Sequence, residues 1–439
     1  MPAGTLETLR AGIGTAVAIR AVGRIVSLDR GRVVVRGMPR GTRLGDRVRI
    51  LCPGAPVNGE VVSLSAELTQ ILPDSALDRV RIDDPVEHVG SDSFAPSDDW
   101  IGRVVDPFGH PLDGRPIRRG THNRALRAPA PGASARRRLG PRLATGLAVL
   151  DTLLPIVRGQ RIGLFAGSGV GKSMLLARLA TGIACDVAVI ALVGERGREV
   201  REFVESALGP EGLARSVVVA ATSDQPASVR RRCALAAMAV AEHFRDRGKH
   251  VLLLSDSVTR FAEAHREVAL ACGEPGSLRG FPPSTSHEIM ALAERAGPGL
   301  ESDTSGDITA VFSVLVPGSD MDEPVADILR GTLDGHIVLD RRIAERGRFP
   351  AIDLLRSVSR SLPEAATPEE LPVIAETRRL LGAYDRAELM VQSGLYAAGS
   401  DALVDRAVRL FPAIDAFMSE DAPEGPSGAF GRLSTLLSG

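Results

Sequence analysis

The stretch RIGLFAGSGVGKSMLLARLA, residues 161–180, determines the fold of the chain around it. The apolar run IGLFA passes into a glycine-rich turn and then into KSMLLARLA, which has helical spacing. The turn nearly matches G-x-x-x-x-G-K-[ST], a loop whose backbone N–H groups surround phosphate oxygens. Its first glycine position holds Ala166, where the strand is expected to end, so alanine fits there if its φ stays negative. Strand, GKS turn and helix together predict a working phosphate-binding loop.

Each part of this loop has an expected role. The glycines allow the backbone to curve closely around phosphate. Lys172 is expected to place its charge on the β- and γ-phosphates, and Ser173 to offer its hydroxyl to Mg²⁺. The candidate nucleotide-binding residues are Gly167, Ser168, Gly169, Val170, Gly171, Lys172, Ser173 and Met174.

Fully apolar runs alternate with helix-compatible stretches in the middle of the chain. The runs are RIGLFAG, DVAVIALVG, SVVVAATS, HVLLLSD and ITAVFSVLV. Continuous apolar runs are typical of parallel strands buried on both faces and joined by crossover helices. We therefore expect an α/β domain with a parallel sheet over residues 91–360.

Short Val/Ile-rich runs separated by Gly, Asp and Pro turns precede this domain. Their spacing predicts a small β-barrel over residues 21–90. Residues 1–20 are a candidate partner-binding helix, with a frayed terminus as the alternative. The cluster Arg136–Arg138, in a Gly/Pro-rich loop after the barrel, is expected to be solvated.

The apolar strands stop near residue 360. The next segment carries a helix start signal, with Thr367 as cap, Pro368 at the first position and Glu370 as the capping-box partner. A second amphipathic segment, SDALVDRAVRLFPAIDAFM, follows. These patterns predict a C-terminal helical domain over residues 361–439.

Acidic and basic residues follow two of the apolar runs. Glu195 comes at the end of one run, where a carboxylate could orient an attacking water with Arg196 beside it. The motif alone slightly favours a surface charge cluster instead. Asp256 ends the run VLLLSD, in the layout of a carboxylate that holds Mg²⁺ through water. Arg260 could face the γ-phosphate or pair with an acid.

Composition excludes several classes of protein. The 53 Lys and Arg residues nearly balance 54 Asp and Glu residues, and aromatic residues make up only 3% of the chain. A nucleic-acid coat protein would be more basic and richer in aromatic side chains. No run approaches the ~18 apolar residues of a membrane span, so we expect peripheral membrane association only.

The motifs together resemble those of a known family. GLFAGSGVGKS, GERGREV, LLLSDSVTRFAEAHREVALACGEPGSLRGFPPS and RRIAERGRFPAIDLLRSVSR are similar to the ATPases of type III protein export. The similarity is greatest to the flagellum-specific branch, a relative of the catalytic subunit of rotary ATP synthases, and it covers nearly the whole chain. That family tolerates alanine at the first loop position.

The resemblance implies a homohexameric ring of subunits, each with an N-terminal barrel, a RecA-like P-loop ATPase domain and a C-terminal helical domain. It makes ATP and Mg²⁺ the expected substrate and metal, with Lys172 and Glu195 at the reaction centre. Arg196 and Arg260 are expected to join them there because of their positions after the apolar runs. Phe349 matches an aromatic residue that stacks on adenine. The other implied roles are those of Ser173 and Asp256 at Mg²⁺, and of Arg360 as an arginine finger for a neighbouring subunit.

The resemblance also implies a cellular setting and leaves alternatives open. The expected partners are the flagellar export apparatus, a stator-like regulator and export substrates or chaperones. The expected location is the cytoplasm, at the inner face of the membrane. An injectisome ATPase is an alternative within the family, and a Rho-like nucleic-acid motor is a more distant one. Non-catalytic ring subunits carry glutamine where this chain has Glu195, which favours a hydrolysing subunit.

Two parts of the sequence depart from the family pattern. His265 stands where glutamine is usual, and residues 284–291 differ from the common text after the paired prolines. Both departures are expected to lie where the ring's inner surface contacts partners. They leave the predicted catalytic residues intact.

Overall fold

The computed structural model describes residues 22–29, 31–91, 94–302, 304–316, 321 and 323–438. The helix predicted within residues 1–20 lies outside the described residues. The chain divides into two compact units. The first contains the barrel and Glu267–Pro275, and the second contains Phe94–Arg266 and the chain from Gly276 onward.

The first unit is built on a closed barrel in the order β1-β2-β5-β4-β3-β6. Strands β1, β2 and β4 alternate more and less buried residues, and Val33 and Val35 of β2, for example, point into the barrel core. Gly31 has φ +82° in the turn between β1 and β2, as a tight turn requires. The predicted barrel is therefore confirmed. Its strands are β1 Val22–Asp29, β2 Arg32–Arg36, β3 Arg47–Ile50, β4 Val57–Leu64, β5 Leu68–Pro73 and β6 Pro85–Gly90.

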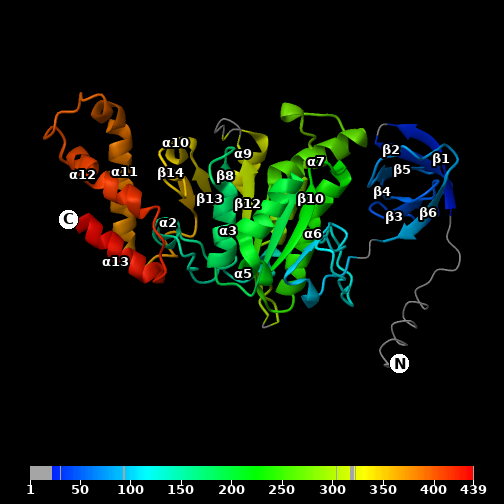
Figure 1. The fold of residues 1–439 in the computed structure, drawn as a ribbon, viewed down its shortest axis with the longest axis horizontal. Helices are drawn as coiled ribbons and strands as arrows, with labels where there is room; N and C mark the ends of the chain where they lie inside the picture. The colour runs from blue at the N-terminus through cyan, green and yellow to red at the C-terminus, as the bar shows by residue number, and fades with distance from the viewer. Residues whose placement is uncertain are drawn as a thin grey trace. The chain divides into compact units, whose positions relative to one another are not determined.

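The second unit contains an eight-stranded sheet in the order β14-β13-β8-β12-β11-β9-β10-β7 (Figure 1). All neighbouring strands pair in parallel except β13 and β14, which pair antiparallel. The five apolar runs of the sequence form β8 to β12, which confirms the predicted parallel sheet. The strands are β7 Arg103–Val105, β8 Arg161–Ala166, β9 Val187–Glu195, β10 Ser216–Thr222, β11 His250–Asp256, β12 Asp307–Leu315, β13 Gly335–Leu339 and β14 Ile352–Ser359.

Alternate side chains of the buried strands enter two separate cores. In β9, Ile190 and Leu192 pack in the core that includes α3 and the C-terminal helices. Val189 and Val193 pack on the other face, in the core that includes α6. Two apolar faces explain why these strands have continuous rather than alternating apolar sequences. The helices of this part are α2 Ala148–Thr152, α3 Lys172–Gly182, α4 Gly197–Glu202, a π-helix Phe203–Leu208, α5 Gly209–Ala214, α6 Ala227–Arg245, α7 Val258–Ala271, α8 Ser284–Arg295, α9 Pro324–Thr332 and α10 Arg341–Glu345. Short 3₁₀ turns lie at Asp98–Trp100, Ala133–Ala135 and Leu278–Gly280.

The C-terminal part is helical, as predicted, with α11 Glu370–Gln392, α12 Ala402–Phe417 and α13 Gly425–Ser438. Thr367 and Glu370 form the predicted reciprocal box: Thr367 N–H donates to Glu370 Oε2 at 2.9 Å, and Glu370 N–H donates to Thr367 Oγ1 at 3.3 Å. The helix begins at Glu370, so Pro368 precedes it instead of occupying its first position. The sequence analysis missed α13, which begins at Gly425 and contains three glycines. Burial of Phe430 and Leu433 stabilises this helix despite its weak propensity.

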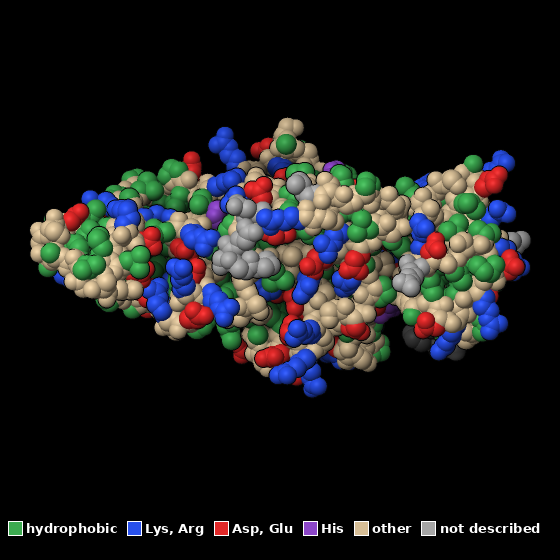
Figure 2. Space-filling view, turned by 90° about the horizontal axis from the view of Figure 1, so that it is seen from above, with side chains coloured by type: hydrophobic (Ala, Val, Ile, Leu, Met, Phe, Trp, Pro, Cys, Tyr) green, Lys and Arg blue, Asp and Glu red, His purple; other side chains and the backbone are tan. Residues whose placement is uncertain are grey.

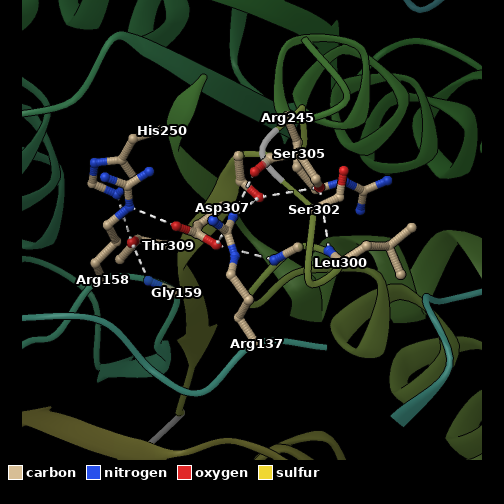
Figure 3. A network of polar contacts seen from close by, with 12 residues as sticks. Arg137, Arg158, Gly159, Arg245, His250, Leu300, Ser302, Ser305, Asp307 and Thr309 are labelled. Atoms are coloured by element: carbon tan, nitrogen blue, oxygen red, sulfur yellow. Dashed lines mark hydrogen bonds and ion pairs between the residues drawn. The ribbon is translucent and has the colours of Figure 1, made fainter. Parts of the chain in front are cut away.

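The prediction that Arg136–Arg138 form a solvated cluster is wrong for two of the three residues. Arg137 donates to Asp307 Oδ1 at 2.8 Å, and Arg158 donates to Asp307 Oδ2 at 2.6 Å (Figure 3). Arg136 donates to the carbonyl oxygens of Pro131 and Ala296 at 3.1 and 2.9 Å. Carbonyl oxygens and the Asp307 carboxylate therefore accept hydrogen bonds from these two guanidiniums, while the buried Nε of Arg137 has no partner among the described residues. A local run of charge does not reveal such contacts.

Candidate active site

The phosphate-binding loop joins the central strand β8 to helix α3. Ala166 is the last residue of β8, so it has the extended backbone that alanine accommodates. Gly169 and Gly171 have φ +76° and +88°, a region that side chains disfavour. The missing first glycine is thus structurally neutral, whereas these two glycines are required by the backbone.

A cavity of about 690 Å³ opens over this loop. Every predicted loop residue lines it except Val170, whose side chain is buried in the hydrophobic core. Three predicted residues from other segments, Glu195, Arg196 and Arg260, also line it. The cavity therefore brings together predicted residues that are far apart in the sequence, from Gly167 to Arg260.

Lys172 lies between the two carboxylates predicted at the strand ends. Its Nζ contacts Asp256 Oδ1 and lies 3.8 Å from Glu195 Oε1. Asp256 also accepts a hydrogen bond of 2.8 Å from Ser313 Oγ on β12. Because β9 and β11 are parallel neighbours, their carboxyl ends meet at one edge of the sheet, beside the loop that follows β8.

The environment of Glu195 suits a group that exchanges protons near neutrality. Burial raises the pKa of Glu195, and repulsion from Asp256 raises it further, to about 7, although Lys172 opposes the change. A hydrogen bond with Glu199 also raises this pKa. A general base operates best with a pKa near the working pH.

Two of the predicted arginines also line the cavity. Arg196 is exposed and lies 3.7 Å from Glu199 Oε1. Arg260 donates from Nη1 to Glu263 Oε2 at 2.9 Å, while its buried Nε has no hydrogen-bond partner among the described residues. Arg260 thus combines both sequence-based interpretations: it pairs with an acid and it faces the cavity.

Sequence reasoning missed three polar residues of this cavity: Glu199, Ser223 and Arg230. Ser223 directly follows β10, and Arg230 lies in the first turn of the helix after it. The signal that identified Glu195 and Asp256, a polar residue just after a buried strand, would also have found Ser223.

Phe349 and Arg360 lie beyond the two ends of strand β14, Phe349 before it and Arg360 directly after it. The ring of Phe349 lies against Gly171, where a Cβ would approach ring carbons to 3.2 Å, so this aromatic side chain borders the phosphate-binding loop. Arg360 is exposed, donates from Nη2 to the carbonyl oxygen of Arg330 at 3.1 Å, and does not line the cavity of its own chain.

The residues expected to hold Mg²⁺ fit that ion. Ser173 and Asp256 line one small cavity of about 240 Å³, adjoining the larger one through Glu195 and Glu199. Within the described residues, no group of three or more His, Cys, Asp or Glu side chains could hold a metal. Mg²⁺ in nucleotide sites needs only one or two protein ligands, since phosphates and water supply the rest.

The two departures from the family pattern contact each other. His265 on α7 is buried, and its Nε2 lies 2.8 Å from Ser284 Oγ at the start of α8. The expectation that this region lines a ring's inner surface stays a prediction.

A parallel sheet, a phosphate loop after its central strand and carboxylates at neighbouring strand ends define a P-loop nucleoside triphosphatase. Residues 146–359 match the family model of the ATP synthase alpha/beta family, nucleotide-binding domain. Residues 366–427 match that of the T3SS EscN ATPase C-terminal domain. The chain belongs to the family of flagellar and type III secretion ATPases, as its full-length relatives demonstrate.

The relatives cover nearly the entire chain. The chain is 44% identical to the flagellum-specific ATP synthase of Caulobacter vibrioides, over 98% of this chain and 99% of the relative. It is 43% identical to the type 3 secretion system ATPase of Xanthomonas euvesicatoria, over 86% of this chain and 84% of the relative. The assembled ATPase EscN of the enteropathogenic E. coli type III secretion system superposes with a TM-score of 0.88 at 36% identity, covering 94% of this chain and 100% of EscN. None of the helices in the described part of the chain is long and apolar enough to span a membrane.

Proposed function

We propose that the chain forms a homohexameric ring whose Mg-ATP hydrolysis energises or primes the export of flagellar proteins. The observation that carries the proposal is the contact of Lys172 with Asp256, beside Glu195, at the edge of the phosphate loop. Cation, metal-binding carboxylate and candidate base thus lie together in one site.

The chain's own residues divide the work of hydrolysis. Backbone N–H groups of Gly167–Met174 hold the phosphates, and Lys172 moves from the carboxylates to the β- and γ-phosphates when ATP enters. Ser173 and Asp256 would hold Mg²⁺, which neutralises charge on the transferred phosphoryl group. Glu195 orients the attacking water and accepts its proton. Arg196 and Arg260, which line the same cavity, face the γ-phosphate.

Arg360 completes the site of a neighbouring subunit. It is exposed, and it lies outside the cavity of its own chain. A guanidinium that reaches the γ-phosphate from another subunit stabilises charge in the transition state. Ring assembly is then a condition for turnover, and the solved relative EscN, described as an assembled ATPase, supports this arrangement.

The proposed partners follow the relatives. EscN has been solved in complex with its central stalk EscO. We extend this to a stator-like regulator, the flagellar export apparatus and its substrates or chaperones, at the cytoplasmic face of the membrane. The domain boundaries at residues 20, 90 and 360 remain part of the proposal.

Flagellar export is favoured over injectisome secretion and over a Rho-like motor. The flagellum-specific relative from Caulobacter is matched over almost its whole length, more than the Xanthomonas secretion ATPase. On the face seen in Figure 2, basic and acidic side chains of the described residues are interspersed instead of forming one basic stripe. A nucleic-acid motor needs such a stripe for phosphate contacts.

The proposal is tested by measuring ATPase rate against protein concentration. A steep rise in specific activity with concentration is expected, because each site needs an arginine from a neighbour. A specific activity independent of concentration in a monomer would contradict the shared site. Rescue of flagellar assembly, but not of needle secretion, in cells lacking the corresponding ATPase would support the flagellar assignment.

A further inference from the structure

The loop between α10 and β14 carries Phe349 beside Gly171 of the phosphate-binding loop, although Phe349 does not line the cavity, and it carries Arg348 in the protein interior. Arg348 is 7% exposed, whereas Phe349 is 49% exposed. Adjacent residues thus point in opposite directions, one toward the phosphate loop and one toward the C-terminal helices.

Arg348 holds the backbone on the far side of Phe349. It donates from Nη1 to the carbonyl oxygen of Pro350 at 3.2 Å and from Nη2 to that of Ile352 at 2.8 Å. The turn is closed by a further bond of 2.8 Å from Ile352 N–H to the Pro350 carbonyl oxygen. One guanidinium therefore fixes the backbone just after the aromatic residue, as a rigid planar donor does best.

The same guanidinium reaches the C-terminal helices. Its Nε lies 3.0 Å from Asp415 Oδ1 on α12, and the side chain of Asp415 is 26% exposed. A second ion pair, Arg346 Nη1 to Glu388 Oε1 at 3.5 Å, joins the same loop to α11 without contacting the backbone carbonyls around Phe349. Both pairs join the loop to the helical domain, but only the arginine of the Arg348–Asp415 pair also holds the backbone beside Phe349.

We propose that Arg348, paired with Asp415, is a positioning residue that sets the place of Phe349 at the nucleotide base and links base binding to helix α12. The proposal rests on the proposed function and on the expectation, implied by the family resemblance, that Phe349 contacts the nucleotide base. A shift of α12 moves Asp415, reorients Arg348 and displaces the aromatic ring from the base. The helical domain consequently controls nucleotide affinity through one buried side chain.

The inference is tested with Arg348→Lys and Asp415→Asn in the full chain. Lysine keeps the charge but cannot bridge two carbonyls and a carboxylate, so KM for ATP should rise about 3- to 10-fold with kcat changed less than twofold. Discrimination between ATP and UTP, measured as a ratio of kcat/KM, should fall by a similar factor, because a displaced ring stacks less selectively. Glu388→Gln is the matched control and should leave both quantities unchanged.

A double-mutant cycle separates positioning from general structural support. Phe349→Ala alone should raise KM about 5- to 100-fold, and adding Arg348→Lys to it should have no further effect on KM. Additive effects of the two substitutions, or an unchanged KM in both Arg348→Lys and Asp415→Asn, would overturn the positioning role. If Arg348→Lys fails to fold, the more exposed Asp415→Asn supplies the same cycle.

The outcomes also distinguish this inference from the proposed function. A normal KM in Phe349→Ala would reject the base contact and the inference with it, while leaving hydrolysis untouched. A raised KM in Phe349→Ala with a normal KM in the Arg348 and Asp415 variants would reject the inference alone.

Discussion

Phe349 and Arg360 flank a single strand, β14, with the phenyl ring against the phosphate loop of the same chain and the guanidinium exposed outside that site. Arg378 of α11 donates to the carbonyl oxygens of Leu354 and Ser357, at 3.1 and 3.3 Å, and so holds the strand between them. One strand thus connects the nucleotide site of its own subunit with the residue that we assign to the neighbour's site.

Replacement of Arg360 by alanine should abolish turnover in a way that a second inactive variant can repair. An arginine finger contributes ~10³–10⁵ to kcat, so Arg360→Ala should lose at least about 10³-fold. In rings assembled at random from equal amounts of Arg360→Ala and Lys172→Ala subunits, the first variant supplies an intact loop and the second an intact arginine. The two intact parts meet at about a quarter of the interfaces. ATPase assays of the mixture should therefore recover up to that share of wild-type activity.

The matched control for Arg360 is Arg356, an exposed arginine within β14. Its Nη1 lies 3.7 Å from Asp340 Oδ2, and neither residue has an assigned role in hydrolysis. Arg356→Ala should therefore keep full activity. Absence of any recovery in mixtures that demonstrably exchange subunits would exclude action between subunits.

Glu195→Gln should bind ATP but hydrolyse it ~10²–10⁴ times more slowly, because glutamine cannot accept a proton from water. Fluorescent-nucleotide titration measures the binding, and phosphate release measures the turnover. Glu205→Gln is the control, since Glu205 is exposed and pairs with Arg201 on the next turn. Turnover within twofold of wild type would remove Glu195 from the mechanism.

The pH dependence of kcat/KM should show an acid limb near pH 7. Burial and repulsion from Asp256 raise the pKa of Glu195 to about 7 in the free enzyme. Below that pH the carboxyl is protonated and cannot act as a base, so kcat/KM falls as pH decreases and levels off above it. The limb should be missing from the residual activity of Glu195→Gln. An acid limb near pH 4.5 in the wild type would show that Glu195 is not the titrating base.

Local signals predicted the loop and the strands, whereas partners distant in sequence escaped prediction. The role of Glu195 as the base came from the family resemblance and stays a prediction. The continuous apolar runs identified β8 to β12, because burial on both faces leaves a mark in the sequence itself. Arg348 and Arg137 look like ordinary surface charge, and only the folded chain brings Asp415 and Asp307 to them. Helix α13 was missed because its stability comes from tertiary packing of a glycine-rich segment.

The helix start at Glu370 also has a partner that the sequence did not reveal, and its contribution to stability can be measured. The capping box with Thr367 was predictable, but Glu370 also accepts two hydrogen bonds from Arg142, at 2.8 and 2.9 Å. Thr367→Ala should reduce the free energy of unfolding by ~0.5–2 kcal/mol. Glu370→Gln should cost about 1–3 kcal/mol, because it also leaves the largely buried Arg142 without its charged partner. Urea denaturation compares the two, and equal losses would show that the ion pair adds nothing to the cap.

Lys172 can be followed directly, because Lys172 and Lys249 are the only lysines in the sequence. The side chain of Lys249 is 52% exposed, and Lys249→Arg keeps its charge while leaving one ε-amine in the chain. Lys172 is 12% exposed and contacts Asp256, so an amine-reactive probe should label it slowly in the free enzyme. Mg-ATP should reduce this labelling further, since the ammonium group then binds phosphate oxygens and is covered. Peptide mass spectrometry reads the modified site, and the α-amine of the same chain serves as the internal reference. Labelling of Lys172 that is unaffected by saturating Mg-ATP would contradict its assignment to the β- and γ-phosphates.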